Sequence, residues 1–250
     1  MSDAGFTYLR QSNTLYNPIT PMAALMAIEN GLLPNEAFIY KANSVHPLFE
    51  EPIDMSAIER TLSRKDNDLS TNQLLVRILE QLLINRDSEI ALFAAESIND
   101  IENMYNERIE NFKKKYESED DPKHLRSIAT QFYELALINE SRNAIRNFYL
   151  CESYSYMKRY GSLARFDRDD LVFTLRIMIT LKSLKLARSV IVQALDRFPE
   201  DRELILLAAE IEYHRKNFRQ VFTLFHRLRD FWESLPELAQ ENHRLWITES

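Results

Sequence analysis

The chain has 250 residues, of which 45% are hydrophobic, with a formal net charge of −7, three glycines and one cysteine. This hydrophobic content allows a sizeable core, and the scarcity of glycine excludes a glycine-rich nucleotide loop and favours helices over parallel α/β or β-sandwich folds. Cys151 alone cannot form an internal disulfide, which fits a reducing compartment.

Charge is unevenly distributed along the chain. Residues 1–120 carry a balance of −9 and residues 121–250 a balance of +2. We therefore expect the N-terminal half not to bind nucleic acid, although its acidic surface suits a basic partner. The first ten residues have no basic and apolar leader, and no stretch is long and apolar enough to cross a bilayer. These features predict a soluble, cytoplasmic protein.

Residues 1–65 are predicted to form short helices and turns that cap the N-terminal end of the fold. Five of the eight prolines fall within residues 1–52. Thr20 and Pro21 have the chemistry of a helix N-cap and first helical position, which predicts a helix over 22–30. Asp54 or Ser56 is expected to begin a helix that reaches residue 64.

Residues 66–120 are predicted to form a helical pair. Leucines and isoleucines between 74 and 83 recur with helical spacing, and a second helix follows from residue 90 to 109. We expect the charged residues 113–121 to form a loop. Residues 87–101, in which Asp87 opens the helix and Ala94-Ala95 permits close helix contact, resemble a HEAT repeat. That resemblance implies one hairpin of an α-solenoid.

Residues 121–250 are predicted to form further antiparallel helical hairpins. Asp121-Pro122 begins a helix, a second runs over 144–158 before Gly161, and others are expected over 171–182, 184–197, 203–216 and 218–231. A capping helix over 236–247 is expected to start at a capping box made by Ser234 and Glu237.

Two of these hairpins repeat one another, since Ala187 aligns with Val221 at an offset equal to the tetratricopeptide period of about 34 residues. They resemble tetratricopeptide repeats, through Leu171, Leu175, Leu184, Ala187, Ile191, Ala194 and Pro199 in the first unit and Ile205, Ala208, Ala209, Phe218, Val221, Phe225 and Leu228 in the second. Glu212 stands where that family usually has an aromatic residue. The resemblance implies an all-α solenoid with a groove that binds other proteins.

A finer resemblance concerns residues 92–109, 131–137 and 147–150, which are similar to the cytoplasmic helical-repeat region of PelE. That family assists assembly of an exopolysaccharide synthesis and secretion machine at the bacterial inner membrane. The resemblance implies a partner among synthase or secretion components and a location peripheral to that membrane. Family members usually carry membrane spans, which this chain lacks.

The tetratricopeptide resemblance also implies which residues face a partner. Its groove positions lie on the first helix of each hairpin, and Arg176 is suited to hold a partner carboxylate while Glu210 and Tyr213 suit a basic or amide side chain. The alternative is that all are ordinary solvated helix residues. The implied positions are Asp169, Val172, Arg176 and Ile179, followed by Glu203, Leu206, Glu210, Tyr213 and His214.

Tyr149, Tyr156 and Tyr160 are spaced to share one helix face, either at a partner interface or packed against the next hairpin. No catalytic motif stands out, the five histidines lack metal-ligand spacing, and Cys151 is predicted to be a small core residue. We therefore predict a non-enzymatic scaffold without cofactor or metal.

Two other classes of function stay open. One is a regulatory subunit of an enzyme. The other is an RNA-binding repeat protein, because phenylalanines at 218, 222 and 225 alternate with basic residues, as in surfaces that bind nucleic acid or anionic membrane. The basic residues are Arg215, Lys216, Arg219, Arg227 and Arg229.

Overall fold

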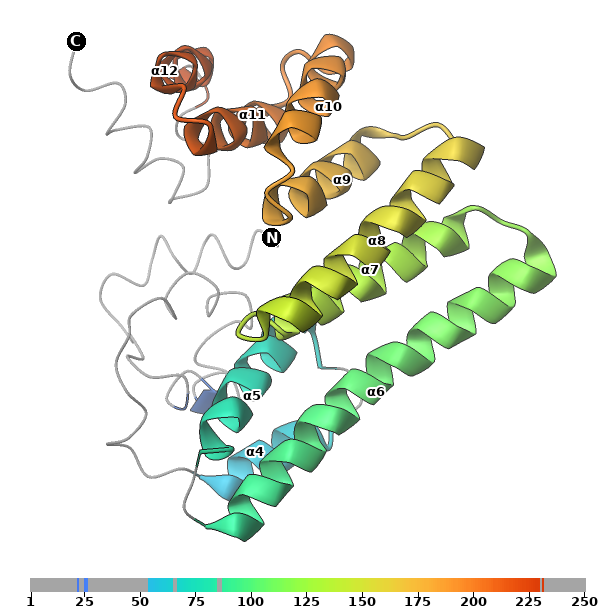
Figure 1. Cartoon of the computed structure of the whole chain (residues 1–250), viewed down its shortest axis with the longest axis vertical. Helices are drawn as coiled ribbons and strands as arrows, with labels where there is room; N and C mark the ends of the chain where they lie inside the picture. Colours follow the sequence, from blue (N-terminus) through green and yellow to red (C-terminus); the bar gives the residue numbers. More distant parts are fainter. Residues whose placement is uncertain are drawn as a thin grey trace. The chain divides into compact units, whose positions relative to one another are not determined.

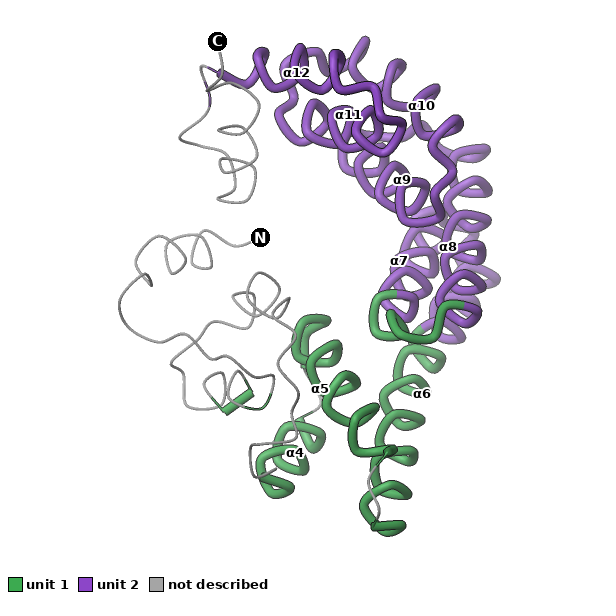
Figure 2. Tube along the Cα trace, turned by 60° about the vertical axis from the view of Figure 1, so that its left-hand side comes forward, with its two compact units in different colours: residues 1–108, 137–143 green, residues 109–136, 144–250 purple. Residues whose placement is uncertain are grey.

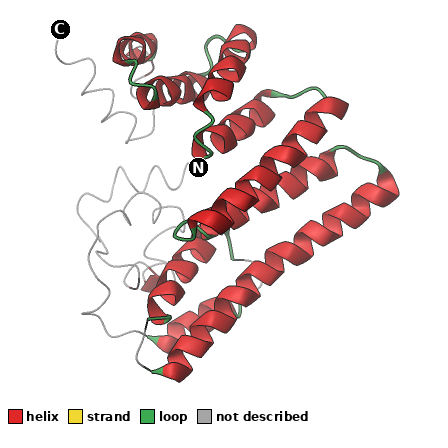
Figure 3. Ribbon diagram, viewed as in Figure 1, coloured by secondary structure: helices red, strands yellow, loops and turns green. Residues whose placement is uncertain are grey.

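The structure, a computed structural model, describes residues 22, 25, 26, 54–64, 67–84, 87–229 and 231. Within these residues all regular secondary structure is helical, and no strand occurs (Figure 3). The all-helical fold class is thereby confirmed. The helices predicted over 22–30 and 236–247, and the capping box at Ser234, lie outside the described residues, apart from Met22, Leu25 and Met26, which are helical.

The helices with described bounds are labelled in Figure 1. They are α4 (Met55–Leu62), α5 (Leu69–Leu82), α6 (Ser88–Glu119), α7 (Lys123–Ile138), α8 (Asn143–Leu163), α9 (Arg168–Thr180), α10 (Leu184–Arg197), α11 (Arg202–His214) and α12 (Phe218–Arg227).

The chain divides into two compact units, drawn in different colours in Figure 2. The first comprises residues 1–108 and 137–143, and the second comprises residues 109–136 and 144–250.

In the first unit, aspartates begin α4 and α5, and a buried polar pair joins α5 to α6. Asp54 Oδ1 accepts a hydrogen bond from the Ala57 amide at 3.1 Å, and Asp68 Oδ1 accepts one from the Thr71 amide at 2.9 Å. These contacts satisfy helix N-termini. Asn72 on α5 donates from Nδ2 to the Tyr105 hydroxyl on α6 at 3.1 Å. Almost the whole apolar stripe of α5 is buried: Leu74, Leu75, Ile78, Leu79 and Leu82.

Helix α6 continues to Glu119, so the loop predicted over 113–121 is wrong for all but its last two residues. Lysine and glutamate are good helix formers, and Lys113 pairs with Glu110 at 2.7 Å along the helix. Aromatic contacts also hold the segment, because Arg159 lies over the Tyr116 ring at 4.9 Å. Local charge was therefore a poor guide to where this helix ends.

In the second unit, α7 and α8 share a core with α9. Its buried members are Leu125, Ala129, Ala136, Leu150, Met157, Tyr160 and Ile177. Ser153 Oγ on α8 donates to the Ala129 carbonyl on α7 at 2.7 Å. Gly161 lies inside α8 and does not end it. A Cβ at Gly161 would meet the Phe166 ring at 2.8 Å, so this glycine permits close approach of that ring.

Cys151 is exposed on α8, and its prediction as a core residue was wrong. The neighbouring Leu150 is fully buried. Successive helical residues point about 100° apart, so an adjacent pair straddles the edge of a buried face. The sequence did not reveal on which side of that edge the thiol would lie.

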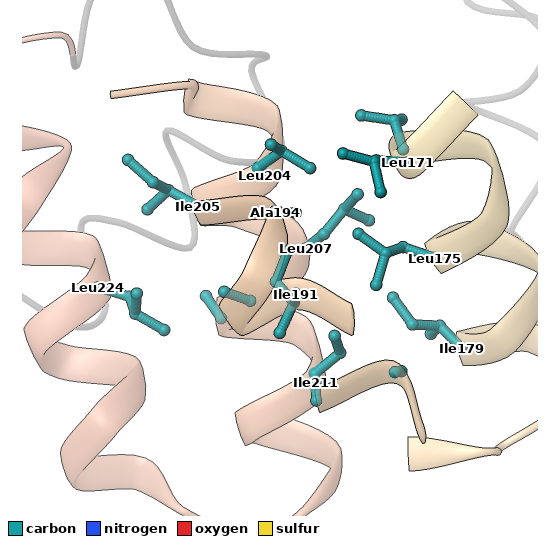
Figure 4. Packing of buried hydrophobic residues seen from close by; sticks show 14 of the residues in the cluster. Leu171, Leu175, Ile179, Ile191, Ala194, Leu204, Ile205, Leu207, Ile211 and Leu224 are labelled. Carbon is teal, nitrogen blue, oxygen red and sulfur yellow. The ribbon is translucent and has the colours of Figure 1, made fainter. Parts of the chain in front are cut away.

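Helices α9, α10, α11 and α12 of the second unit share a second core. Helix α10 contacts α9 and α11, and α11 also contacts α9 and α12. Figure 4 shows leucine and isoleucine side chains from these helices meeting, among them Leu175, Ile191, Leu207 and Leu224. Ala187 and Ala194 are fully buried on α10. Small side chains at these points allow close helix packing.

The backbone of α9 and α10 is repeated in α11 and α12. Asp167 caps α9 through the Asp170 amide at 2.8 Å, and Asp201 caps α11 through the Leu204 amide at 2.9 Å. The turns after α9 and α11 each contain a left-handed lysine, Lys182 (φ 57°) and Lys216 (φ 60°). The amide of each lysine donates to the carbonyl of the third residue before it at 2.8 Å.

Buried positions recur with the same spacing. Each of these residues of the first hairpin has a buried counterpart at the aligned position of the second: Leu171 and Ile205, Leu175 and Ala209, Ala187 and Val221, Ile191 and Phe225, Ala194 and Leu228. The two hairpins thus share their caps, their turns and their core positions.

Candidate functional site

The residues predicted to face a partner fall into two groups according to burial. Asp169 and Arg176 on α9, and Glu210, Tyr213 and His214 on α11, are exposed. The Tyr213 side chain is the most open aromatic of the set, at 54%.

The others are less accessible to a partner. Glu203 and Leu206 are half-buried. Val172 and Ile179 are only 6% and 8% exposed and belong to the core that α9 shares with α10 and α11. Their side chains therefore lie beneath the candidate surface and do not face a partner.

Arg176 is already engaged by an acidic side chain of its own chain. Its Nη2 donates to Glu203 Oε1 at 2.6 Å, and Glu203 Oε2 accepts from Arg168 Nη2 at 2.7 Å. Arg168 also donates from Nε to Asp201 Oδ2 at 2.8 Å and pairs with Asp169 at 2.9 Å. A partner carboxylate at Arg176 must compete with Glu203.

This network changes the proton affinity of its members. The hydrogen bonds that Arg168 donates, to Asp201 above all and then to Asp169 and Glu203, raise its pKa in spite of its partial burial. Burial opposes ionisation of Asp201, but the hydrogen bonds from Arg168 and from the Leu204 amide outweigh it and lower the Asp201 pKa. The charges of this network therefore largely satisfy one another, and they tie α9 to the start of α11.

Among the described residues, no arginine lies within ion-pair distance of Glu210, whose carboxylate instead lies 3.8 Å from the His214 ring one helical turn later. Tyr213 lies beside this pair and makes edge contacts with His214 at 6.0 Å and with Phe218 at 5.9 Å. An exposed carboxylate next to an exposed phenol can accept a cationic side chain.

Tyr133 on α7 belongs to the same region, although its sequence context did not single it out. Its ring meets Phe173 of α9 edge-on at 5.3 Å. Burial raises the pKa of its hydroxyl, and the charge of Glu210 acts in the same direction, while Arg176 and a hydrogen bond with Thr180 oppose it. Tyr133 was missed because its hairpin is out of phase with the repeat. Its position beside the inward-facing Phe132 was the available signal.

The tyrosines of α8 pack within the second unit. Tyr160 is buried and stacks on Phe166 at 5.7 Å. Tyr149 and Tyr156 are half-buried, and both rings contact Phe132 of α7, at 6.2 Å and 5.6 Å. These contacts account for the three rings as packing within the unit.

A small surface pocket in the first unit is a second place to look for a ligand. It is lined by Gln73, Arg77, Glu80, Leu137, Ile138, Glu140 and Ser141. Arg77 pairs with Glu140 at 2.6 Å, Ser141 donates to Glu80, and Gln73 donates to the Leu137 carbonyl. Its polar groups therefore satisfy one another.

Two further findings concern the described residues alone. Among them no cluster of three histidine, cysteine, aspartate or glutamate side chains is placed to hold a metal ion. None of their helices is long and apolar enough to cross a membrane.

Comparison with protein-family models, with curated proteins and with solved structures gives no match for this chain. The candidate surface is therefore identified from the burial and the contacts of this chain's own residues, and not by analogy with a relative.

Proposed function

We propose that this chain is a non-enzymatic helical-repeat scaffold whose second unit binds other proteins. The observation that carries this proposal is the recurrence of caps, left-handed turns and buried positions between the two hairpins of α9–α12. Units of this kind bury their apolar faces against neighbouring units and leave a concave groove, lined by their first helices, to partners.

The proposal includes the repeat types and boundaries expected from the sequence. Residues 121–250 are tetratricopeptide-like, residues 66–120 form a HEAT-like pair, and residues 1–65 cap the N-terminal end. Contacts of α11 with both α9 and α12 are those of stacked hairpins and support the first of these assignments.

We infer that the partner presents a basic side chain to the surface formed by Glu210, Tyr213 and Tyr133. Glu210 is exposed and lacks an arginine partner among the described residues, whereas Arg176 is held by Glu203 at 2.6 Å. Glu210 is therefore the acidic side chain of this surface that is not held by an arginine among the described residues. A lysine or arginine gains both the carboxylate and the aromatic faces.

The resemblance to the PelE helical-repeat region gives a place to look for that partner. We propose the components of an exopolysaccharide synthesis or secretion assembly at the inner membrane. The support is the sequence resemblance of residues 92–109, 131–137 and 147–150.

Cross-linking and capture from the native cell test this proposal with three variants of the full chain. Glu210→Lys and Tyr213→Ala alter the candidate surface. Val192→Ser is the matched control, because Val192 on α10 is as exposed as Tyr213, at 54%, and lies outside the candidate surface. We expect the first two to reduce capture of a specific protein by about tenfold each and the control to leave it unchanged. If Glu210→Lys and Tyr213→Ala leave capture unchanged while Val192→Ser abolishes it, the binding surface lies elsewhere.

A further inference from the structure

The outer face of α12 combines exposed phenylalanines with cations. Phe218 and Phe222 are 48% and 41% exposed and lie one helical turn apart. His226 follows one turn later and contacts the Phe222 ring at 6.3 Å. Arg219 is exposed beside them. The opposite face of the helix is buried through Val221, Leu224 and Phe225.

Among the described residues, several cations of this face have no compensating carboxylate. Residues 215–229 contain five lysines and arginines and no aspartate or glutamate, and Asp230 and Glu233 follow in the sequence. Arg215 is paired with Glu212 at 2.9 Å, and Arg227 donates to the Pro199 carbonyl at 2.5 Å. By contrast, no described acidic side chain lies within ion-pair distance of Lys216, Arg219 or Arg229, which are all exposed.

Several other arginines of the same unit are paired, since Arg126, Arg168, Arg176 and Arg188 each contact a carboxylate at 2.9 Å or less. Lys158 and Arg165 are exposed and, like Arg219, have no ion pair among the described residues. The combination of such cations with the exposed rings of Phe218 and Phe222 is therefore what distinguishes α12. Charge complementarity calls for an anionic occupant, and the exposed phenylalanines call for one that also has an apolar layer.

We propose that the outer face of α12 binds the surface of an anionic membrane. Arg219, Lys216 and Arg229 contact the lipid headgroups, and Phe222 and Phe218 enter the boundary between headgroups and acyl chains. Such binding needs a cluster of cations with adjoining apolar side chains and no shaped groove. The helix lies parallel to the surface, and no membrane-spanning helix is required.

Both exposed rings have an aromatic neighbour, which limits the ring faces that remain open for base stacking. Phe222 has the His226 ring tilted beside it at 32°, and Phe218 has Tyr213 against it at 5.9 Å. Apolar insertion needs only exposed carbon surface, which both rings keep. The proposal does not rest on the partner surface at Glu210, although Tyr213 of that surface contacts Phe218 at 5.9 Å.

Vesicle co-sedimentation of the full chain tests the proposal. The probes are vesicles of pure phosphatidylcholine and vesicles with about a third phosphatidylserine, each in low and high salt. We expect binding to the anionic vesicles, weakened by salt, and little binding to the neutral ones. Arg219→Glu should weaken binding by about thirtyfold and Phe222→Ser by about tenfold.

Two matched controls separate this face from general effects. Arg165→Glu makes the same charge change at another exposed arginine, and Phe148→Ser removes a phenylalanine that is 58% exposed on α8. Both should bind as the unmodified chain does, apart from a small effect of net charge. Equal loss in variant and control, or binding to neutral and anionic vesicles alike, would overturn the proposal.

A single-stranded RNA oligonucleotide and a poly-glutamate peptide complete the experiment. Each is offered as a competitor to the anionic vesicles. If either displaces the chain from vesicles and loses affinity with Phe222→Ser, the face belongs to nucleic acid or to an acidic protein segment, and the membrane proposal is wrong. If the RNA or the peptide displaces the chain from vesicles but binds Phe222→Ser as well as it binds the unmodified chain, it competes through charge alone, and this result agrees with the proposal.

Discussion

Glu212 has a carboxylate that is only 7% exposed, at the point where α10, α11 and the start of α12 meet. It accepts hydrogen bonds from Arg188 Nε at 2.9 Å, from Arg215 Nη1 at 2.9 Å and from Asn217 Nδ2 at 2.7 Å. The residue that breaks the expected aromatic pattern therefore has a structural role. A buried carboxylate is tolerated where several donors satisfy it.

Glu212→Ala should lower the free energy of unfolding by about 2–3 kcal/mol, because two arginines and an asparagine lose a charged acceptor. Urea denaturation measures this. Glu210→Ala is the control on the same helix, since Glu210 is exposed and, among the described residues, has one ion-pair contact, with His214 at 3.8 Å. It should change stability by less than about 0.5 kcal/mol. Equal effects at the two positions would remove the structural role assigned to Glu212.

Tyr133 makes the stability of the folded chain depend on pH in a direction that its burial fixes. Burial raises the pKa of its hydroxyl above the ordinary value of 10.0, so the folded chain holds this proton more tightly than the unfolded chain. The stabilisation is complete below pH 10 and is lost as pH rises through the folded-state pKa. We expect the stability of the unmodified chain to fall more steeply above pH 10 than that of Tyr133→Phe. Parallel alkaline denaturation curves would contradict this.

At the scale of elements, the two hairpins of α9–α12 end their first helices in the same way. Lys182 and Lys216 occupy the left-handed region, with φ of 57° and 60°. This conformation is strained for a residue with a Cβ and costs about 1 kcal/mol relative to glycine. The turn geometry is required for the second helix to fold back onto the first, so the chain maintains the strain at both positions.

Lys182→Gly and Lys216→Gly should therefore each raise the free energy of unfolding by about 0.5–1 kcal/mol, despite the greater freedom of glycine in the unfolded chain. Thermal and urea unfolding measure the change. Lys185→Gly, an exposed position inside α10, should instead destabilise by up to about 1 kcal/mol. A loss of stability at Lys182 or Lys216 would show that their side chains matter more than their backbone conformation.

At the scale of the whole molecule, the described helices belong to two units, and within the second unit one helix belongs to two cores. Ile177 of α9 packs with α7 and α8, whereas Leu175 packs with α10 and α11. Arg126 of α7 and the fully buried Asp170 of α9, paired at 2.6 Å, connect the same elements. Repeat proteins owe their cooperativity to such shared elements.

Leu175→Ala should remove about 2–5 kcal/mol of stability, because Leu175 is fully buried. Native-state hydrogen exchange should show amides of α10 and α11 losing protection together with those of α9, which contacts both. Leu92→Ala, at a leucine 60% exposed on α6, is the control and should have little effect. Loss of protection confined to α9 would mean that the hairpins do not unfold as a unit.

The helices themselves were largely readable from the sequence. The helix predicted over 184–197 has those bounds, and Asp54, one of the two predicted starts of the helix that reaches residue 64, caps α4 with its side chain. Most of the buried positions that recur between the two hairpins were also predicted, but the aligned pair Leu184 and Phe218 is not buried, since Leu184 is half-buried and Phe218 is 48% exposed. Capping and periodicity depend on residues within a few turns of one another, so they are encoded locally.

The candidate surface was predicted only in part. Glu210, Tyr213 and Arg176 are exposed as expected, but which of them is free to act was not evident. Arg176 is held by a residue 27 positions later, and Tyr133 joins the region from a hairpin outside the repeat phase. Periodicity assigns a residue to a helix face, and it does not reveal what a neighbouring helix places opposite.

The sequence by itself thus determined that this protein is helical, where most helices begin, and which side chains form the repeating core. Only the tertiary structure decided that Glu203 neutralises Arg176, that Glu212 is satisfied in the core, that Cys151 is exposed and that Val172 and Ile179 are buried. The reason is physical. Helix formation follows from interactions between near neighbours, whereas burial and charge pairing follow from residues that meet only when the helices pack.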